Sequence, residues 1–178
     1  MRIISGKFKG RRITPPTNIS ARPTTDFAKE GLFNLLLHRI DFEETTALDL
    51  FAGIGSVSLE LISRECKSIT AIEMSERHCA FIRKACSNLK IDNLLLIKSD
   101  VFRFIDKTRQ QYDLIFADPP YDLKQLIEIP DIIFKNNLLT DKGLFILEHS
   151  VKNDFVKHPN FLEQRHYGNV RFSFFVKK

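Results

Sequence analysis

Long apolar runs are absent from this sequence, in which no stretch approaches the roughly 18 consecutive apolar residues that a membrane-spanning helix needs. The start of the chain alternates basic and apolar side chains, so it also lacks the continuous apolar segment of a signal peptide. A composition of 43% hydrophobic and 28% charged residues is typical of a globular protein. We therefore expect a cytoplasmic protein that makes no membrane contact.

Cysteine is also scarce, with three residues that form neither an even set nor a Cys-x-x-Cys pair. They are Cys66, Cys79 and Cys86. If the segment around them is a helix, Cys79 and Cys86 share one face with Ile82 and Leu89, which favours core packing over metal or redox chemistry. We expect no disulfide framework and no metal site.

Acidic residues are missing from the leading segment, although the whole chain contains 22 of them and has a net charge of +5. The cations that precede the first acid, Asp26, are Arg2, Lys7, Lys9, Arg11, Arg12 and Arg22. A purely cationic segment favours contact with a polyanion such as RNA. The alternative is a solvated basic tail, because basic termini are common.

The same leading segment predicts a short β-hairpin rather than a disordered tail. Residues 2–14 alternate around Gly6 and Gly10, which suit the turns of such a hairpin. Side chains in a strand repeat with a period of two, so Lys7, Lys9 and Arg11 would share one face. A strand pair with a charged face would suit contacts to phosphate groups.

The middle of the chain alternates short apolar runs with helical patterns, and the length of 178 residues suits one domain. An amphipathic helix is expected from about Thr25. Strands are expected at 47–51, 69–72, 94–97, 114–117 and 144–147, and further helices at 57–65, 76–89 and 101–109. This order predicts an α/β fold whose mostly parallel sheet is covered on both faces.

The end of the chain has a different pattern. Strands at 161–167 and 170–176, joined by a tight turn at Gly168 and Asn169, predict an antiparallel C-terminal hairpin. Pro130 predicts a broken or kinked helix after the fourth strand. In open sheets of this kind ligands bind beyond the carboxyl ends of the strands, so functional residues are expected directly after each strand.

A glycine-rich turn follows the first expected strand. Gly53 and Gly55 allow a tight turn and a close approach of the backbone to a ligand. Glu73 ends the second strand 20 residues after Gly53, where a carboxylate can accept the hydroxyls of an adenosine ribose. Ser58 replaces the third glycine of a dinucleotide fingerprint, so a cofactor without phosphates is favoured. The candidate cofactor residues here are Asp49, Gly53, Gly55, Glu73 and Met74.

Asp100 and Val101 follow the third expected strand, at the same edge of the sheet. A carboxylate at this place can accept a hydrogen bond from an adenine amino group, and a backbone amide can donate to the adenine ring. We therefore add both residues to the candidate cofactor site.

The turn Asp118, Pro119, Pro120 and Tyr121 is the most specific signal in the chain. Two prolines remove two donors, which predicts that backbone carbonyls and the Asp118 carboxylate point at a ligand without internal partners. Hydrogen bonds accepted from an exocyclic base amine favour a more tetrahedral, reactive nitrogen. Tyr121 can stack on the base, a contact worth about 1–3 kcal/mol. These four residues are the candidate catalytic site, and Asp118 is also counted with the cofactor. Asp113, earlier in the strand, is interpreted as a solvated residue.

These motifs, in this order and spacing, resemble the class I S-adenosylmethionine-dependent methyltransferases of the amino-group branch. The opening of the chain is similar to a narrower family. Residues 2–11, 22–26 and 30–34 resemble the bacterial RsmD-type 16S ribosomal RNA guanine-N2 methyltransferases. The similarity covers essentially the whole chain, including Tyr167, Gly168 and the last strand.

The resemblance implies a Rossmann-like class I methyltransferase sheet of seven strands. It also implies methyl transfer to N2 of a guanine in 16S ribosomal RNA, with the 30S subunit as the substrate. It implies that Glu73 binds ribose, that Asp100 and Val101 bind adenine, and that Gly53 and Gly55 bind the methionine end. Arg22 to Thr24 would close over the cofactor, which adds Thr24 to its ligands. We expect a monomer with a single methyltransferase domain at 1–178, divided into a basic hairpin and arm at 1–24 and a catalytic core at 25–178.

Three alternatives remain open on the sequence. An adenine-N6 DNA methyltransferase also uses an Asp-Pro-Pro-Tyr turn, but this chain has no spare length for a target-recognition region. A non-catalytic RNA-binding protein of the same fold is disfavoured by the intact Glu73, Asp100 and Asp118. A nicotinamide oxidoreductase is disfavoured by Ser58 and by the proline turn.

Overall fold

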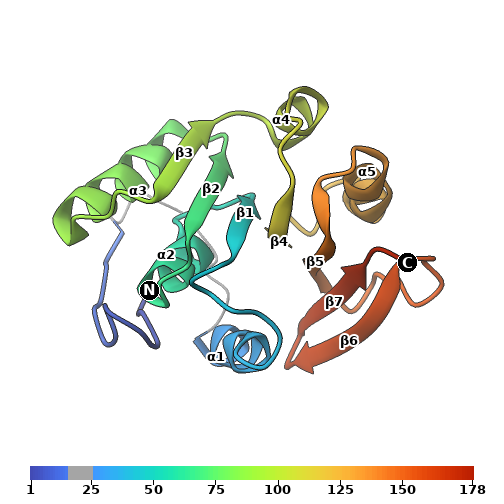
Figure 1. Cartoon of the computed structure of the whole chain (residues 1–178), viewed down its shortest axis with the longest axis horizontal. Helices are drawn as coiled ribbons and strands as arrows, with labels where there is room; N and C mark the ends of the chain where they lie inside the picture. The colour runs from blue at the N-terminus through green and yellow to red at the C-terminus, as the bar shows by residue number, and fades with distance from the viewer. Residues whose placement is uncertain (16–25) are drawn as a thin grey trace.

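A seven-stranded sheet forms the centre of the computed structural model, which describes residues 1–15 and 26–178 (Figure 1). The strands are β1 (Thr46–Leu50), β2 (Ser68–Glu73), β3 (Leu94–Lys98), β4 (Tyr112–Ala117), β5 (Leu139–Ser150), β6 (Phe161–Tyr167) and β7 (Val170–Val176). Their order across the sheet is β3-β2-β1-β4-β5-β7-β6. Neighbouring strands are parallel except where β7 pairs with β5 and β6. The predicted mostly parallel sheet with an antiparallel C-terminal hairpin is confirmed.

Helices cover both faces of this sheet (Figure 1). One face carries α1 (Asp26–Leu36), α2 (Ser56–Ser63) and α3 (Glu76–Leu89); the other carries α4 (Val101–Lys107), the 3₁₀ turn η1 (Leu126–Glu128) and α5 (Ile129–Lys135). Coverage on both faces explains why the central strands are continuous apolar runs rather than alternating ones. No helix within 1–15 and 26–178 is long and apolar enough to cross a membrane.

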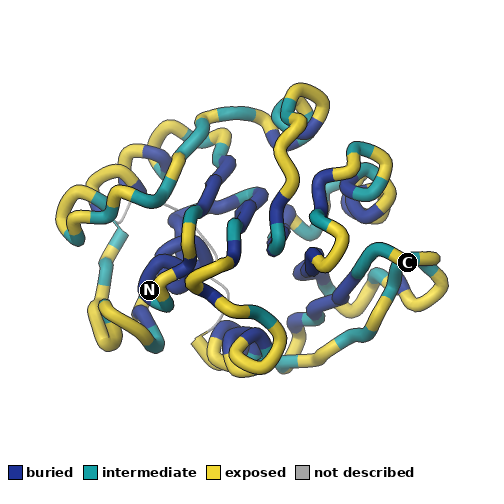
Figure 2. Tube along the Cα trace, viewed as in Figure 1, coloured by how far each residue is buried: buried dark blue, intermediate teal, exposed yellow. Residues whose placement is uncertain are grey.

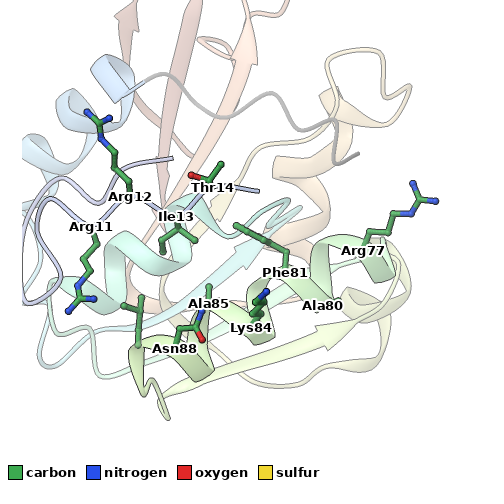
Figure 3. A pocket seen from close by; sticks show the side chains of 11 residues that line it. Arg11, Arg12, Ile13, Thr14, Arg77, Ala80, Phe81, Lys84, Ala85 and Asn88 are labelled. Atoms are coloured by element: carbon green, nitrogen blue, oxygen red, sulfur yellow. The ribbon is translucent and has the colours of Figure 1, made fainter. Parts of the chain in front are cut away.

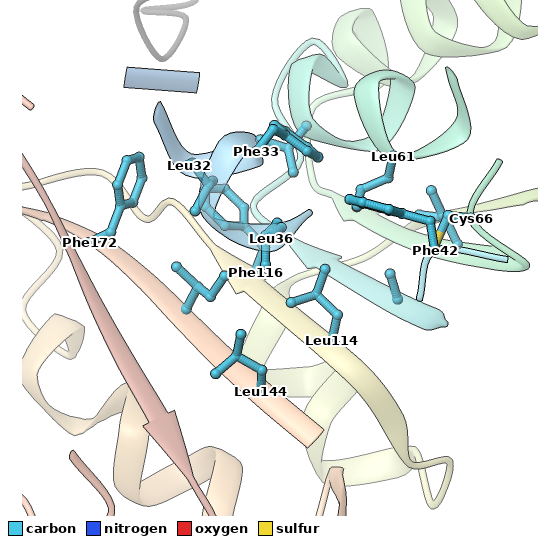
Figure 4. Close-up of a cluster of buried hydrophobic side chains, with 14 of the residues drawn as sticks. Leu32, Phe33, Leu36, Phe42, Leu61, Cys66, Leu114, Phe116, Leu144 and Phe172 are labelled. Carbon is cyan, nitrogen blue, oxygen red and sulfur yellow. The ribbon is translucent and has the colours of Figure 1, made fainter. Parts of the chain in front are cut away.

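The core consists of two large apolar layers on either side of the sheet. On the α1 side, the buried side chains of Phe33, Leu61, Leu114 and Phe116 pack together (Figure 4). Each such side chain contributes about 1.5–3 kcal/mol when it leaves water. Figure 2 shows the consequence, since the central strands are buried and the outer faces of the helices are exposed.

Most expected elements have the expected bounds, and the differences have local causes. Pro130 lies in the first turn of α5, where its missing N–H is tolerated, so the chain forms η1 and then a new helix. Strand β5 is longer than its apolar run because Leu139 pairs with Tyr112 before the register shifts. Asp113 was wrongly interpreted as solvated: it is half-buried and accepts hydrogen bonds from Thr46 and Thr140. Burial alone would raise the pKa of Asp113, but these hydrogen bonds outweigh it and lower the pKa.

The N-terminal arm, residues 1–15, is a hairpin closed by one antiparallel bridge between Arg2 and Arg12. Between these residues the chain forms bends and turns rather than strands. The predicted common face of Lys7, Lys9 and Arg11 is therefore wrong. Turn hydrogen bonds replace the ladder, from Lys9 N–H to the Gly6 carbonyl and from Arg11 N–H to the Phe8 carbonyl. Gly6 and Gly10 both have φ near +80°, which favours turns over extended backbone.

Buried polar contacts hold the N-terminal arm on α2. Glu60, a fully buried residue of α2, accepts hydrogen bonds from the N–H groups of Ile4 at 2.7 Å and Ser5 at 3.0 Å. Lys29 of α1 is also buried, and it donates to the Arg2 carbonyl at 2.6 Å and lies 3.8 Å from Glu60. The interpretation of these residues as a solvated tail is therefore wrong for the docked part of the arm.

Candidate active site

Five carboxylates lie along one side of the sheet, each near or just beyond the carboxyl end of one of the strands β1 to β5. They are Asp49, Glu73, Asp100, Asp118 and Glu148, and we call this set the acidic edge. The carboxyl ends of parallel strands meet at one side of a sheet, which is where open α/β sheets bind ligands. Such an edge favours ligands with a positive charge and with hydroxyl or amino donors, and it disfavours phosphates.

The loop from β1 to α2 lies at the centre of this edge. Gly53 has φ +56° and Gly55 has φ +77°, and a Cβ at Gly55 would lie 3.1 Å from Ile82 of α3. The loop needs glycine because its backbone is left-handed and packs closely on α3. Phe51, which is not a glycine, also has φ +63° at the end of β1. Such strained residues cost about 1–3 kcal/mol and cluster at functional sites.

Asp49 supports this loop from below. It is buried and accepts hydrogen bonds from the Ser58 N–H at 3.1 Å and the Ser58 hydroxyl at 2.5 Å. The N-cap residue of α2 is Gly55, which has no side chain to accept from the first helical turn, so Asp49 supplies that acceptor. Burial raises the pKa of Asp49 to about 7 even though both hydrogen bonds from Ser58 favour the ionised form. The structure therefore places Asp49 beneath the glycine loop.

Glu73 connects the glycine loop to the start of α3. Its Oε2 accepts from the Gly53 N–H at 2.8 Å, and its Oε1 accepts from the Ser75 N–H at 2.7 Å. The His78 Nδ1 lies 3.3 Å from Oε1. Each carboxylate oxygen can accept a second hydrogen bond, so Glu73 retains capacity for hydroxyl donors. Met74, directly after it, is exposed.

Asp100 and Val101 begin α4 at the end of β3. Asp100 is exposed and caps the helix, with its Oδ1 accepting from the Arg103 N–H at 2.9 Å. Val101 is buried. Next to it, Phe102 meets Phe51 edge to face with ring centroids 6.3 Å apart. The two rings connect β1 to α4, and the sequence interpretation missed both because each was assigned only to its own helix or strand.

Strand pairing places the proline turn beside the glycine loop. Leu50 of β1 pairs with Ala117 of β4, and the Asp118 N–H donates to the Leu50 carbonyl at 3.4 Å. Pro119 is buried and Pro120 is exposed. The Pro120 carbonyl accepts from the Leu123 N–H at 2.9 Å, so the prediction that the carbonyls of this turn have no internal partner is wrong for Pro120.

Tyr121 completes the turn through a contact that the sequence interpretation missed. Its hydroxyl donates to Oε1 of Glu148 at 3.2 Å, and Glu148 is a buried residue of β5. The signal for Glu148 was available, because a carboxylate near the end of an otherwise apolar strand requires a reason to be buried. This contact fixes one end of the Tyr121 side chain.

The predicted RNA-binding cations differ in their surroundings. Lys7, Lys9, Arg11 and Arg12 are exposed on the N-terminal arm. Arg2 has its guanidinium 3.6 Å from Asp26. The remaining predicted site residues, Arg22 and Thr24, lie outside the described residues, as does the rest of the segment expected to close over the cofactor.

Comparisons with known proteins place this arrangement in a family. The model of the family described as conserved hypothetical protein 95 matches residues 1–176. Ribosomal RNA small subunit methyltransferase D of Buchnera aphidicola subsp. Baizongia pistaciae is 32% identical over 161 residues, which are 90% of this chain and 82% of the relative. The Escherichia coli protein yhhF, assigned as a methyltransferase, superposes with a TM-score of 0.85 at 30% identity over 98% of this chain and 96% of its own.

A more distantly related structure of the same fold was solved with a bound ligand. SMU.776, assigned as a methyltransferase and solved in complex with SAH, matches 83% of this chain and 49% of its own with a TM-score of 0.66 at 18% identity. That likeness concerns the fold alone. The family match over residues 1–176 and the relative at 32% identity carry the assignment. The chain belongs to the family described as conserved hypothetical protein 95, the RsmD family of ribosomal RNA small subunit methyltransferases.

Proposed function

We propose that this protein transfers a methyl group from S-adenosylmethionine to the exocyclic N2 amine of a guanine in 16S ribosomal RNA of the 30S subunit. Methylation of ribosomal RNA with S-adenosylmethionine is the activity of its family. The observation that carries the proposal is the position of the turn Asp118 to Tyr121 directly beside the glycine loop. An amine held by the turn would lie next to a methyl donor held by the loop.

The residues of the acidic edge fit this cofactor. S-adenosylmethionine supplies an activated methyl group on a positively charged sulfonium, and it has ribose hydroxyls and amino groups but no phosphate. We assign the ribose hydroxyls to Glu73, the adenine to Asp100 and Val101, and the methionine end to Gly53 and Gly55. Asp49, Met74, Thr24 and Asp118 are the further residues assigned to this site.

The target amine is assigned to the proline turn. The Asp118 carboxylate accepts a hydrogen bond from the amine, which favours the tetrahedral geometry of an attacking nitrogen. Pro119 and Pro120 have no N–H, so the turn presents no competing backbone donors at these positions. Tyr121 stacks on the base, and its hydroxyl bond to Glu148 holds the ring in place. Positioning of nucleophile against electrophile then supplies most of the rate.

The cations Arg2, Lys7, Lys9, Arg11, Arg12 and Arg22 are assigned to RNA phosphates, with Arg2 the weakest because Asp26 lies close to it. We propose a monomer that acts on cytoplasmic 30S subunits. In this proposal residues 1–178 form a single methyltransferase domain, with the arm at 1–24 and the catalytic core at 25–178.

The test is methyl transfer to purified 30S subunits from a strain that lacks this protein. Labelled S-adenosylmethionine is supplied, and the nucleosides of the product RNA are separated. We expect label in N2-methylguanosine of the small-subunit RNA. Label in another nucleoside, or in DNA adenine, would refute the guanine-N2 assignment.

A pair of variants in the same turn tests the role of Asp118. Asp118→Ala is expected to reduce kcat at least about tenfold, because it removes the carboxylate that positions the amine. The affinity for S-adenosylmethionine should change little, because Asp118 is one of several residues assigned to the cofactor. Asp122→Ala removes an exposed carboxylate four positions later in the same turn region and is expected to retain wild-type turnover. Equal turnover in the two variants would remove Asp118 from the site.

A further inference from the structure

A groove of about 580 Å³ lies between the N-terminal arm and α3 (Figure 3). One wall consists of residues 11–14, and the other is the face of α3 from Arg77 to Leu89. Ile13, Phe81, Ala85 and Leu89 make much of its lining apolar. Figure 3 shows Ile13 on the arm and Phe81 on α3 near the middle of the groove, with Arg77 near one end and Arg11 near the other.

The cations that line the groove differ from those elsewhere on α3. Among the described residues, no carboxylate lies within ion-pair distance of Arg11, Arg12, Arg77 or Lys84. By contrast, Arg83, also on α3 but outside the groove, lies 2.8 Å from Glu76. A ligand of the groove therefore meets positive charges that the described protein does not neutralise.

Both walls of the groove are fixed. The arm is anchored through Glu60 and Lys29, and the carbonyl of Ser63 in α2 accepts the Lys7 N–H at 2.6 Å. On the other side, α3 is held by the packing of Ile82 against Ala52 and Ala71. A groove with two anchored walls and an apolar floor is prepared for binding, which reduces the ordering cost when a ligand enters.

We propose that this groove binds a single-stranded segment of the RNA substrate, with a base on the apolar floor and phosphates against Arg11, Arg12, Arg77 and Lys84. The inference rests on the proposed function and extends the RNA surface from the arm to α3. Single strands are the form of RNA that presents unstacked bases to apolar and aromatic side chains, whereas an A-form duplex keeps its bases inside. A cationic rim around an apolar floor is the arrangement by which proteins bind single strands.

The test measures binding of short fluorescent oligouridine, which contains no guanine and so cannot occupy the proposed methyl-acceptor site as substrate. The double variant Arg77→Gln with Lys84→Gln removes two proposed phosphate contacts. At about 0.15 M salt this should weaken oligouridine binding roughly tenfold and reduce the slope of log affinity against log salt by about 1.4. The matched control, Lys142→Gln with Lys178→Gln, removes two exposed cations on β5 and just after β7, which are separated from α3 by several strands, and should change affinity less than about twofold. Ala80→Glu, an exposed change in the groove lining, should also weaken binding.

Methyl transfer to 30S subunits separates this proposal from the function on which it rests. The groove variants should raise KM while kcat and S-adenosylmethionine affinity stay near wild type. If the wild type methylates 30S subunits but the double variant and its control bind oligouridine equally, the groove proposal is overturned and the function stands. If the double variant weakens binding of duplex RNA as much as binding of oligouridine, the single-strand assignment is overturned. If it weakens binding of 30S subunits but not of oligouridine, the groove binds a protein partner in place of RNA. If the wild type transfers no methyl group, the proposed function fails, whatever oligouridine binding shows.

Discussion

The anchorage of the N-terminal arm predicts that Glu60 and Lys29 contribute unequally to stability, although they form one buried ion pair. Glu60 accepts from two backbone N–H groups and from Arg64, whose Nε lies 3.0 Å from it. Lys29 donates to the Arg2 carbonyl and to the Ser56 hydroxyl. Burial lowers the pKa of Lys29, and the nearby Glu60 opposes that effect. Loss of Glu60 therefore leaves more groups without partners than loss of Lys29.

The expected magnitudes follow from those partners. Glu60→Leu leaves a buried cation unpaired, which costs about 3–5 kcal/mol, and it also leaves the N–H groups of Ile4 and Ser5 without their acceptor. Lys29→Met leaves Glu60 with Ile4, Ser5 and Arg64 as donors. The Lys29 change should therefore cost about 1.5–3 kcal/mol, the value of a hydrogen bond to a charged group.

Urea unfolding of both variants measures the two free energies, and limited trypsin digestion reports the arm directly. Trypsin should cleave after the arm residues Lys7 and Lys9 faster in Glu60→Leu than in Lys29→Met. Arg64→Met, at the C-cap of α2, removes one partner of Glu60 but leaves the hydrogen bonds from Ile4 and Ser5, so it is the control for general loosening of α2. Equal costs for Glu60→Leu and Lys29→Met, or trypsin cleavage as fast in the wild type as in Glu60→Leu, would refute the reasoning.

Two further predictions concern single positions. Gly6→Ala should cost at least about 2 kcal/mol more than Gly10→Ala in urea unfolding, because both glycines are left-handed but only at Gly6 would a Cβ meet backbone, 1.8 Å from the Ser63 carbonyl oxygen; equal costs would contradict the docked arm. Asp49→Asn should gain stability relative to the wild type as pH rises from about 4 to about 7.5. The folded pKa of Asp49 is raised from 3.8 to about 7, so ionisation costs the folded wild type increasingly through that window, while a neutral amide still accepts from Ser58. A stability difference that does not change with pH would show that Asp49 is not desolvated as described.

The fold could be predicted from the sequence because its signals are local and repeat along the chain. Apolar runs bounded by helical periodicity located β1 to β4 closely, and the helix 76–89 matched α3 at both ends. The N-terminal arm could not be predicted in the same way. Its alternation resembles a strand, but two left-handed glycines turn the chain, and its conformation depends on Glu60 and Ser63, which are more than 50 residues away.

The candidate site was predicted where a residue follows directly after a strand, and it was missed where burial decides the role. Glu73, Asp100 and Asp118 lie at strand ends, so topology alone brings them to one edge. Glu148 lies within β5 and is recognised only through its contact with Tyr121. Arg77 and Lys84 were not predicted either, because helical cations on a basic protein are ordinary until the arm forms a groove against them.

Charge is divided between two surfaces of this molecule, and α2 connects them. Carboxylates at the strand ends form the acidic edge, where a sulfonium and hydroxyl donors are favoured. Cations that have no carboxylate partner among residues 1–15 and 26–178 gather on the arm and α3. Helix α2 begins at the glycine loop, where Ser56 accepts from Lys29, and one turn later Glu60 of the same helix holds the arm. Because one short helix bears both contacts, a displacement of the arm by RNA must act on the same helix that shapes the glycine loop. A variant that loosens the arm, such as Glu60→Leu, should therefore weaken binding of S-adenosylmethionine as well as RNA, whereas the groove variants should weaken RNA binding alone.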